Sequence, residues 1–342
     1  MDSPLIWTVT VAVLVAVIAF DFLVVVRKPH EPTFAESARW TGFYIGLALL
    51  FGASMFLWND AQSATEFFAG YITEWSLSVD NLFVFLVILT RFAVPAQQRQ
   101  RVLLIGVVLA LVLRGIFIAV GAAALSAFSW AFYIFGFFLL WTAISVAREG
   151  GGADEDEEYR ENRLVRLVRK IMPVTEDYRG GNFLVREHGR RFATPLLIVI
   201  VAIGTTDLLF ALDSIPAIFG LTQDPYIVFT ANAFALMGLR QLFFVVQGLL
   251  SRLIYLSYGL AAVLAFIGIK LVIEALHRNT LPFINGGEHV EWLPVIPTWF
   301  SLIVIVVCVG AAAVASLVAT RGRNGVDEPD EADLPQASGD LD

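Results

Sequence analysis

The chain has 342 residues, of which 58% are hydrophobic and 16% are charged. Soluble domains have about 45–50% apolar and about 25% charged residues, so this composition excludes an ordinary soluble protein and indicates a membrane protein. The net charge of −8 says little, because the tail alone contributes −5. The single cysteine, Cys308, excludes an intrachain disulfide and any CxxC redox or zinc motif. The sequence also lacks the HExxH motif of metalloproteases and the GxxxxGK[ST] motif of P-loop ATPases.

Nine apolar segments are each long enough to cross about 30 Å of hydrocarbon as a helix. They lie at roughly residues 5–26, 40–58, 67–90, 102–125, 127–147, 195–220, 226–249, 253–276 and 298–319. The first is a retained anchor rather than a signal peptide, because the basic residues Arg27 and Lys28 follow it and none precedes it. The sequence therefore predicts an all-α polytopic membrane protein with about nine transmembrane helices.

The basic residues predict the orientation in the cytoplasmic membrane. Loops one, three, five and seven and the C-terminal tail hold 20 of the 23 Lys and Arg residues, and such residues accumulate on the cytoplasmic side. The N-terminus is therefore expected outside and the C-terminus in the cytoplasm.

The same pattern divides the chain into four parts. The charged loop has ten acidic and ten basic residues and is expected to form a cytoplasmic linker with one exposed or membrane-surface helix, and the acidic tail is expected to be disordered. The parts are an N-terminal membrane half at 1–147, the loop at 148–194, a C-terminal membrane half at 195–320 and the tail at 321–342.

Ionisable residues inside the spans are candidates for function, because each costs at least about 2.5–3.5 kcal/mol at mid-membrane. They are Asp21, Glu74, Asp80, Arg114, Asp207, Asp213, Arg240, Lys270 and Glu274, with Asn81 and Asn232 as uncharged companions. Three of them have simple local explanations. Asp21 is close enough to Arg27 to be a helix-end carboxylate that reaches the interface, and Lys270 and Glu274 are spaced for a local salt bridge.

The other six ionisable residues form an internal repeat, its first copy within 67–147 and its second within 195–276. Residues 74–82 and 207–215 each place an acid six positions before an Asp, and the next helix in each half carries a Leu-Arg pair that contains Arg114 or Arg240. The predicted orientation makes the two copies run in opposite directions. Inverted repeats of this kind are typical of secondary transporters, which bind substrate at the repeat interface near the midplane.

The spacing suggests how the acids could share an ion. Residues six apart on a helix are separated by about 9 Å along its axis, so one ion cannot easily bind both acids of one unbroken helix. Pro216 removes a backbone donor and predicts a helix break that frees the Leu212 carbonyl. We therefore expect Asp80 and Asp213 to pair at the midplane, with oxygen ligands that suit a hard divalent cation. Glu74 is then expected as an outer gate and Asp207 as an inner one.

A structural alternative remains open. The four acids could merely neutralise Arg114 and Arg240 inside the bundle. Four acids against two arginines nevertheless leave a surplus of two negative charges, which matches one divalent cation or two protons.

Two segments of the chain resemble the signatures of the TerC family of integral membrane proteins. They are Tyr71 to Phe85 and Thr206 to Ile218, with supporting matches at Asn232, at Gly238-Leu239-Arg240 and at Gly268-Ile269-Lys270. The resemblance covers most of the chain. It implies manganese export across the bacterial cytoplasmic membrane, with tellurite resistance as the historical label.

The resemblance also carries the family's intramembrane acids onto Glu74, Asp80, Asp207 and Asp213. One departure concerns the position three before the first Asp of the second signature, which is often acidic in the family and is Gly204 here. The exact ligand set and the proton stoichiometry therefore stay open.

Together these arguments predict a secondary transporter, not an enzyme, that exports Mn²⁺ in exchange for protons. The expected metal ligands are Asp80, Asp213, Glu74, Asp207, Asn81 and Asn232, with Arg114, Arg240 and Lys270 as counter-charges or gating residues. The expected partners are the lipid bilayer and the transported ions, with no nucleic acid and no tightly bound cofactor. The sequence does not separate Mn²⁺ from Ca²⁺ or Mg²⁺.

Two rival functions stay open. One is export of a small carboxylated molecule held by Arg114 and Arg240. The other is a membrane scaffold in a stress-response complex. An intramembrane aspartyl protease is disfavoured, because Asp207 and Asp213 share one helix and the Gly-x-Gly-Asp string is missing.

Overall fold

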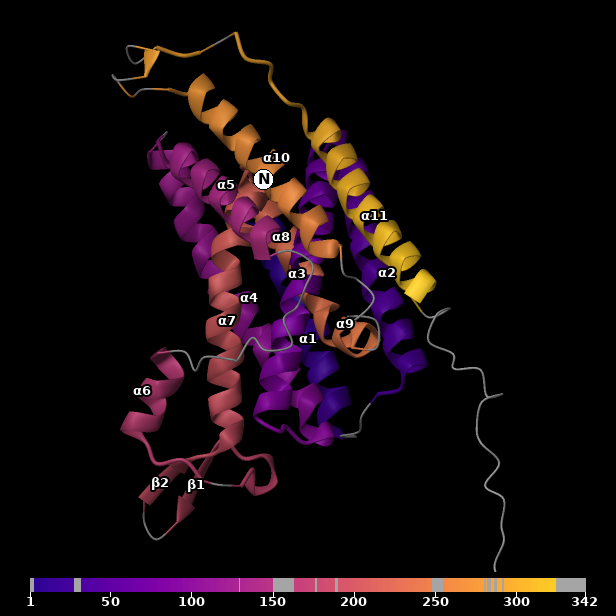
Figure 1. Ribbon diagram of the computed structural model, residues 1–342, viewed down its shortest axis with the longest axis vertical. Coiled ribbons are helices and arrows are strands. Elements are labelled where there is room, and N and C mark those ends of the chain that lie inside the picture. Colours follow the sequence, from indigo (N-terminus) through magenta and orange to yellow (C-terminus); the bar gives the residue numbers. More distant parts are fainter. Residues whose placement is uncertain are drawn as a thin grey trace, which may run out of the picture.

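A computed structural model shows a bundle of long helices with one small hairpin at an end (Figure 1). It describes residues 3–27, 32–128, 130–149, 163–175, 177–187, 190–247, 255–279, 281, 284–285, 288–290 and 292–323. The predicted class, an all-α polytopic membrane protein, is confirmed. The predicted disordered tail lies beyond the described residues, apart from its first three.

The helices follow one another with short connections in each half of the chain. Their bounds are α1 Pro4–Arg27, α2 Phe34–Trp58, α3 Ala61–Arg91, α4 Ala96–Ala127, α5 Ala131–Glu149, α6 Arg163–Ile171, α7 Pro195–Phe219, α8 Pro225–Met237, α9 Leu239–Val246, α10 Leu256–His277 and α11 Thr298–Arg323. Local sequence explains several starts. Asp60 caps α3 by accepting a hydrogen bond from the Ser63 amide, and Pro195 and Pro225 occupy the first turns of α7 and α8, where a missing amide proton costs nothing.

Within the described residues, seven helices are long and apolar enough to cross a membrane, and the bent pair α8 and α9 makes an eighth. The helix of the predicted third span, α3, is 31 residues long but is not in that set, so the structure supports seven or eight of the nine predicted spans by length and apolarity. The predicted seventh span, 226–249, is not continuous: the axis bends by 41° between Met237 and Leu239. Gly238 lies at this bend. Glycine destabilises a helix because its backbone has more conformational freedom to lose, so a bend is favoured there.

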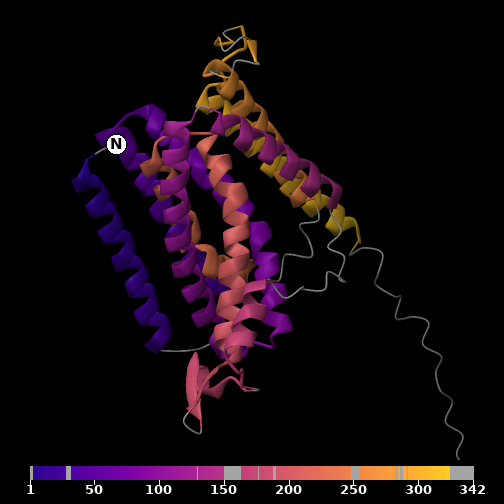
Figure 2. The ribbon, with the colours of Figure 1, turned by 90° about the vertical axis from the view of Figure 1, so that its left-hand side faces the viewer.

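The helices pack as a bundle with α1 along one edge and α5, α10 and α11 toward the other (Figure 2). The most extensive contacts join α10 to α5, α3 to α8 and α4 to α7. Helices α3, α4, α7 and α8 therefore form the interior, which is where polar side chains can be shielded from lipid.

Helices α3 and α7 run antiparallel, as two hydrogen bonds at their ends show. At one end, which we name the hairpin end, the Tyr178 hydroxyl donates to the carbonyl of Phe92 (2.5 Å), next to the end of α3. At the other, the far end, the Thr222 hydroxyl donates to Glu66 near the start of α3 (2.5 Å). Thr222 follows α7 and Tyr178 precedes it, so α7 starts at the hairpin end, where α3 finishes. The depth of a residue on either helix can therefore be counted from the hairpin end.

The charged loop is more structured than predicted. Its expected single helix is present as α6, where Val165 is fully buried and the helix contacts α7. The structure adds an antiparallel hairpin of β1, Leu184–Glu187, and β2, Arg190–Ala193, that the sequence analysis missed. Arg101 on α4 donates to the carbonyl of Gly181 (3.1 Å) and lies over the ring of Phe183, so this loop is anchored to the bundle.

Pro216 does not break its helix, contrary to the prediction. α7 runs without interruption to Phe219, and Pro216 lies in its last turn. A proline this close to a helix end removes only the hydrogen bond to the Leu212 carbonyl, and the carbonyl of Pro216 still accepts from the Gly220 amide (3.0 Å).

Candidate functional site

A buried arginine in the middle of α4 joins the two halves of the repeat. The side chain of Arg114 is 1% exposed. Its Nη1 pairs with Glu74 Oε1 on α3, while Nη2 and Nε donate to Asp207 Oδ1 (2.9 Å) and Oδ2 (3.2 Å) on α7. One guanidinium thus holds two fully buried carboxylates, and the three groups together carry a formal charge of −1.

Two hydroxyls complete the Arg114 cluster. Arg114 Nη1 also donates to Ser214 Oγ (3.3 Å), and Ser78 Oγ donates to Glu74 Oε1 (3.4 Å). The second carboxylate oxygen of Glu74, Oε2, is buried and has no hydrogen-bond partner among the described residues. A buried oxygen without a donor is costly and needs an explanation, such as a ligand that it binds.

The Arg114 cluster corrects the predicted depths of the four acids. Glu74 and Asp207 contact the same guanidinium, so they lie at one level and are not separate outer and inner gates. Because α3 and α7 are antiparallel, Asp80 lies about 9 Å from this level toward the hairpin end and Asp213 about 9 Å toward the far end. The predicted midplane pair is therefore wrong in this conformation: the backbone positions of Asp80 and Asp213 are about 18 Å apart along the bundle.

The remaining predicted ligands differ in their surroundings. Asp213 is half-buried and accepts a hydrogen bond from the Thr142 hydroxyl on α5 (3.1 Å). Asn232 on α8 is 1% exposed, and neither its amide nitrogen nor its oxygen has a partner in the described part of the chain. Asn81 is also buried, and the side chain of Asp80 lies outside the described residues.

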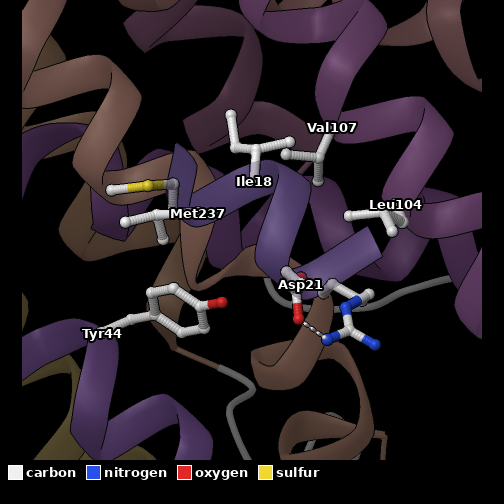
Figure 3. A pocket seen from close by; sticks show the side chains of 8 residues that line it. Ile18, Asp21, Tyr44, Leu104, Val107 and Met237 are labelled. Carbon is white, nitrogen blue, oxygen red and sulfur yellow. Dashed lines mark hydrogen bonds and ion pairs between the residues drawn. The ribbon is translucent and has the colours of Figure 1, made fainter. Parts of the chain in front are cut away.

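The second arginine of the repeat has a different partner from the first. Arg240 Nη2 pairs with Asp21 Oδ1 on α1 (2.5 Å), and Nη1 donates to Gln100 Oε1 on α4 (3.0 Å; Figure 3 shows the ion pair). The expectation that Asp21 reaches the membrane interface is wrong, because Asp21 is 6% exposed and neutralises Arg240 inside the bundle. Its position within an otherwise apolar run was the one sign of this role in the sequence.

The predicted local pair on α10 is also different. Glu274 pairs with Arg278 (2.7 Å) rather than with Lys270, and Lys270 Nζ donates to Ser301 Oγ on α11 (3.3 Å). Lys270 thus links two helices and lies apart from the Arg114 cluster.

The model of the integral membrane protein TerC family matches residues 59–324, which is most of the chain and includes both repeat copies. The chain belongs to the TerC family. No solved structure matches it.

Relatives of this TerC chain come from several bacteria. An uncharacterised membrane protein of Mycobacterium tuberculosis is 46% identical over 322 residues, 94% of this chain and 81% of that protein. One from Myxococcus xanthus is 40% identical over 321 residues, 94% of each chain. A protein of Escherichia coli named "Putative membrane-bound redox modulator Alx" is 41% identical over 284 residues, 80% of this chain and 87% of its own length.

The structure shows what surrounds Gly204. α7 passes close to α4 there, and a Cβ on Gly204 would collide with the Leu109 side chain. An acid at this position would need Leu109 to move. Gly204 itself contributes no side-chain oxygen here.

The four acids are spread along the length of the bundle instead of being gathered in one cluster. Among the described residues, no three His, Cys, Asp or Glu side chains lie close enough together to hold a metal ion. Any divalent cation in this conformation would be held by one or two carboxylates at a time, supplemented by amide, hydroxyl or water oxygens.

Proposed function

We propose that this TerC protein is a secondary transporter that exports divalent cations, Mn²⁺ first among them, across the cytoplasmic membrane in exchange for protons. The observation that carries the proposal is the pairing of Glu74 and Asp207, from opposite halves of the repeat, on the single buried guanidinium of Arg114. Substrate sites of inverted-repeat transporters lie at such a junction. The surplus negative charge there supports a cationic substrate over a carboxylated one.

The cluster suggests how binding could occur. Arg114 occupies the carboxylate oxygens that a cation would use, so the cation and Arg114 compete for Glu74 and Asp207. Carboxylate and hydroxyl oxygens are ligands that hard divalent cations prefer. The unpartnered Oε2 of Glu74 offers the first contact, and Ser214 stays beside Arg114 as an alternative acceptor when the carboxylates leave it.

The order of the acids suggests a route. We place the hairpin end in the cytoplasm because the basic loops gather there. A cation leaving the cell would then meet the level of Asp80, next the Arg114 cluster, and finally Asp213, in steps of about 9 Å. Asn232, with both amide atoms unpartnered among the described residues, would supply a neutral oxygen on the way, and Asn81 another near Asp80.

Protons would reach these carboxylates from the outer side and compete with the cation for them. A carboxylate that takes up a proton on the outer side loses its attraction for the cation and releases it. Mn²⁺ is the first choice on family resemblance, since oxygen ligands alone do not exclude Ca²⁺ or Mg²⁺.

Transport by the purified chain in proteoliposomes tests the proposal. An imposed pH gradient should drive Mn²⁺ across the membrane in the direction opposite to the proton flow. Inhibition of this movement by added Ca²⁺ or Mg²⁺ measures the selectivity. Asp207→Asn should abolish this movement, because it removes one of the two carboxylates that would bind the cation. The change is nearly isosteric, so the fold should be kept. Asp60→Asn is the matched control: it removes one exposed carboxylate on α3, and asparagine caps a helix as well as aspartate does.

The outcomes separate the rivals. Loss of Mn²⁺ movement in Asp207→Asn with normal movement in Asp60→Asn supports the transporter. If the unaltered chain moves no divalent cation under any gradient, the proposal is wrong and the scaffold function gains. The name of the Escherichia coli relative suggests a redox role. This chain offers little support for a thiol-based role of that kind, because its one cysteine, Cys308, can form no intrachain disulfide.

A further inference from the structure

The N-terminal helix α1 lies at the edge of the bundle but contributes one buried charged side chain to it. α1 lies along one edge, with 11% of its apolar span buried, and precedes the TerC match at 59–324 (Figure 2). Asp21 is nevertheless 6% exposed and pairs with Arg240 of the second repeat copy. A buried ion pair contributes little net stability compared with apolar side chains, so stability alone does not explain this arrangement.

A small cavity lies beside the Asp21–Arg240 pair. Its polar lining is Asp21, Arg240 and Tyr44, whose hydroxyl points toward Asp21, and the rest of the lining is apolar (Figure 3). Arg240 Nε is buried without a partner among the described residues. With Asp21 and Tyr44 it gives the cavity several polar neighbours, and a buried water needs two or more of these.

The pair lies near the hairpin end. Asp21 is six residues, or about 9 Å, from the end of α1, and Gln100 is four residues, or about 6 Å, from the start of α4. In the orientation proposed above, this is the cytoplasmic third of the bundle. The Arg114 cluster lies deeper, near the middle of α4.

The charges facing Asp21 suit a proton and not a metal. Among the described residues, α9 contributes Arg240 and the uncharged Gln241, and α2 contributes Tyr44. α4 contributes the uncharged Gln100, and α8 contributes Met237. One carboxylate beside a permanent cation is a poor site for a divalent ion. It can alternate between a neutral acid and a carboxylate paired with arginine.

We infer that Asp21 is the residue that releases the exchanged proton into the cytoplasm, an inference that rests on the proposed antiport. The O–H bond of the protonated Asp21 breaks, the proton joins a water molecule in the cavity and leaves to the cytoplasm, and the carboxylate pairs with Arg240. Arg240 keeps its charge throughout and favours release. The α8–α9 bend at Gly238 places Arg240 where this pairing is possible.

The test compares two transport modes of the full chain in proteoliposomes. The first is Mn²⁺ movement driven by a pH gradient, and the second is exchange of labelled for unlabelled Mn²⁺ at equal pH, which needs no net proton release. Asp21→Asn should slow the gradient-driven mode by about tenfold or more, as loss of a proton-transferring group does, and leave exchange nearly unchanged. Arg240→Gln should shift gradient-driven transport toward higher internal pH, because Asp21 then holds its proton more tightly.

Controls distinguish the possible failures. Gradient-driven transport that survives in Asp21→Asn overturns the inference while leaving the proposed function intact. Equal loss of both modes in Asp21→Asn and in the charge-free Asp21→Asn/Arg240→Gln variant shows a structural anchor and also overturns it. If the unaltered chain shows neither mode, the proposed function has failed, and the inference fails with it.

Discussion

The two arginines of the repeat occupy matching sequence positions and yet have different surroundings. Arg114 binds two carboxylates, Glu74 and Asp207, that both belong to the repeat. Arg240 binds one carboxylate, Asp21, from a helix outside the repeat, and an amide, Gln100. The Arg114 cluster keeps a surplus negative charge, whereas the Arg240 pair is neutral.

The two arginines of the predicted repeat are therefore neutralised in different ways. A symmetric pair of arginines would require four carboxylates at the centre, and the structure places only two there. In the other half, Asp21 of α1 neutralises Arg240. The central cluster is thus suited to a cation, and the second pair to holding or releasing one proton.

Removing Arg114 should have the largest effect on stability. Arg114→Met leaves two buried carboxylates without a counter-charge and should lower the free energy of unfolding by about 3–5 kcal/mol. Thermal unfolding in detergent measures this loss. Arg148→Met, an exposed change at the end of α5, is the control and should have almost no effect. An Arg114→Met protein as stable as the control would show that the cluster is not ionised as described.

Arg240→Gln should lower the free energy of unfolding by less, about 1–3 kcal/mol, because a single carboxylate loses its partner. The second change Asp21→Asn should restore most of this stability, since deleting both members of a buried pair is often nearly neutral. Adding Asp207→Asn to Arg114→Met should restore only part, because Glu74 stays unpaired. Equal rescue in both cases, measured by the same unfolding assay, would remove the distinction between the two sites.

The smallest effects concern the neutral partners. Gln100→Leu removes the acceptor of Arg240 Nη1 and should cost about 0.5–1.5 kcal/mol. Ser214→Ala should cost less, because Arg114 Nη1 still pairs with Glu74 and its bond to Ser214 is the longer one at 3.3 Å. Unfolding free energies in the reverse order would contradict these assigned partners.

Much of the fold could be predicted because the bilayer demands long apolar runs, and the interior acids and arginines could be found because each is costly there. The relative depth of the acids could not. The predicted inverted repeat would relate Glu74 to Asp207 and Asp80 to Asp213, and it permits either pair to lie at the centre. The reach of Arg114 decides between them, and that contact joins residues 93 positions apart.

Other misses have local causes. The hairpin in the charged loop is short and rich in arginine, so it lacks the apolar alternation that indicates a strand. The bend at Gly238 was hidden because apolar residues continue on both sides of it. The partner of Arg240 was missed because Asp21 had a simpler neighbour in the sequence, Arg27.

The pairing of α1 with the bundle has a practical consequence for how the molecule can be divided. The region shared with the family begins at residue 59, but the physical unit begins earlier, since the carboxylate that balances Arg240 comes from residue 21. A chain shortened to the family boundaries would keep every residue of the central cluster and would bury an arginine without its anion. The limits of this protein for truncation are therefore better judged from this ion pair than from the extent of family similarity.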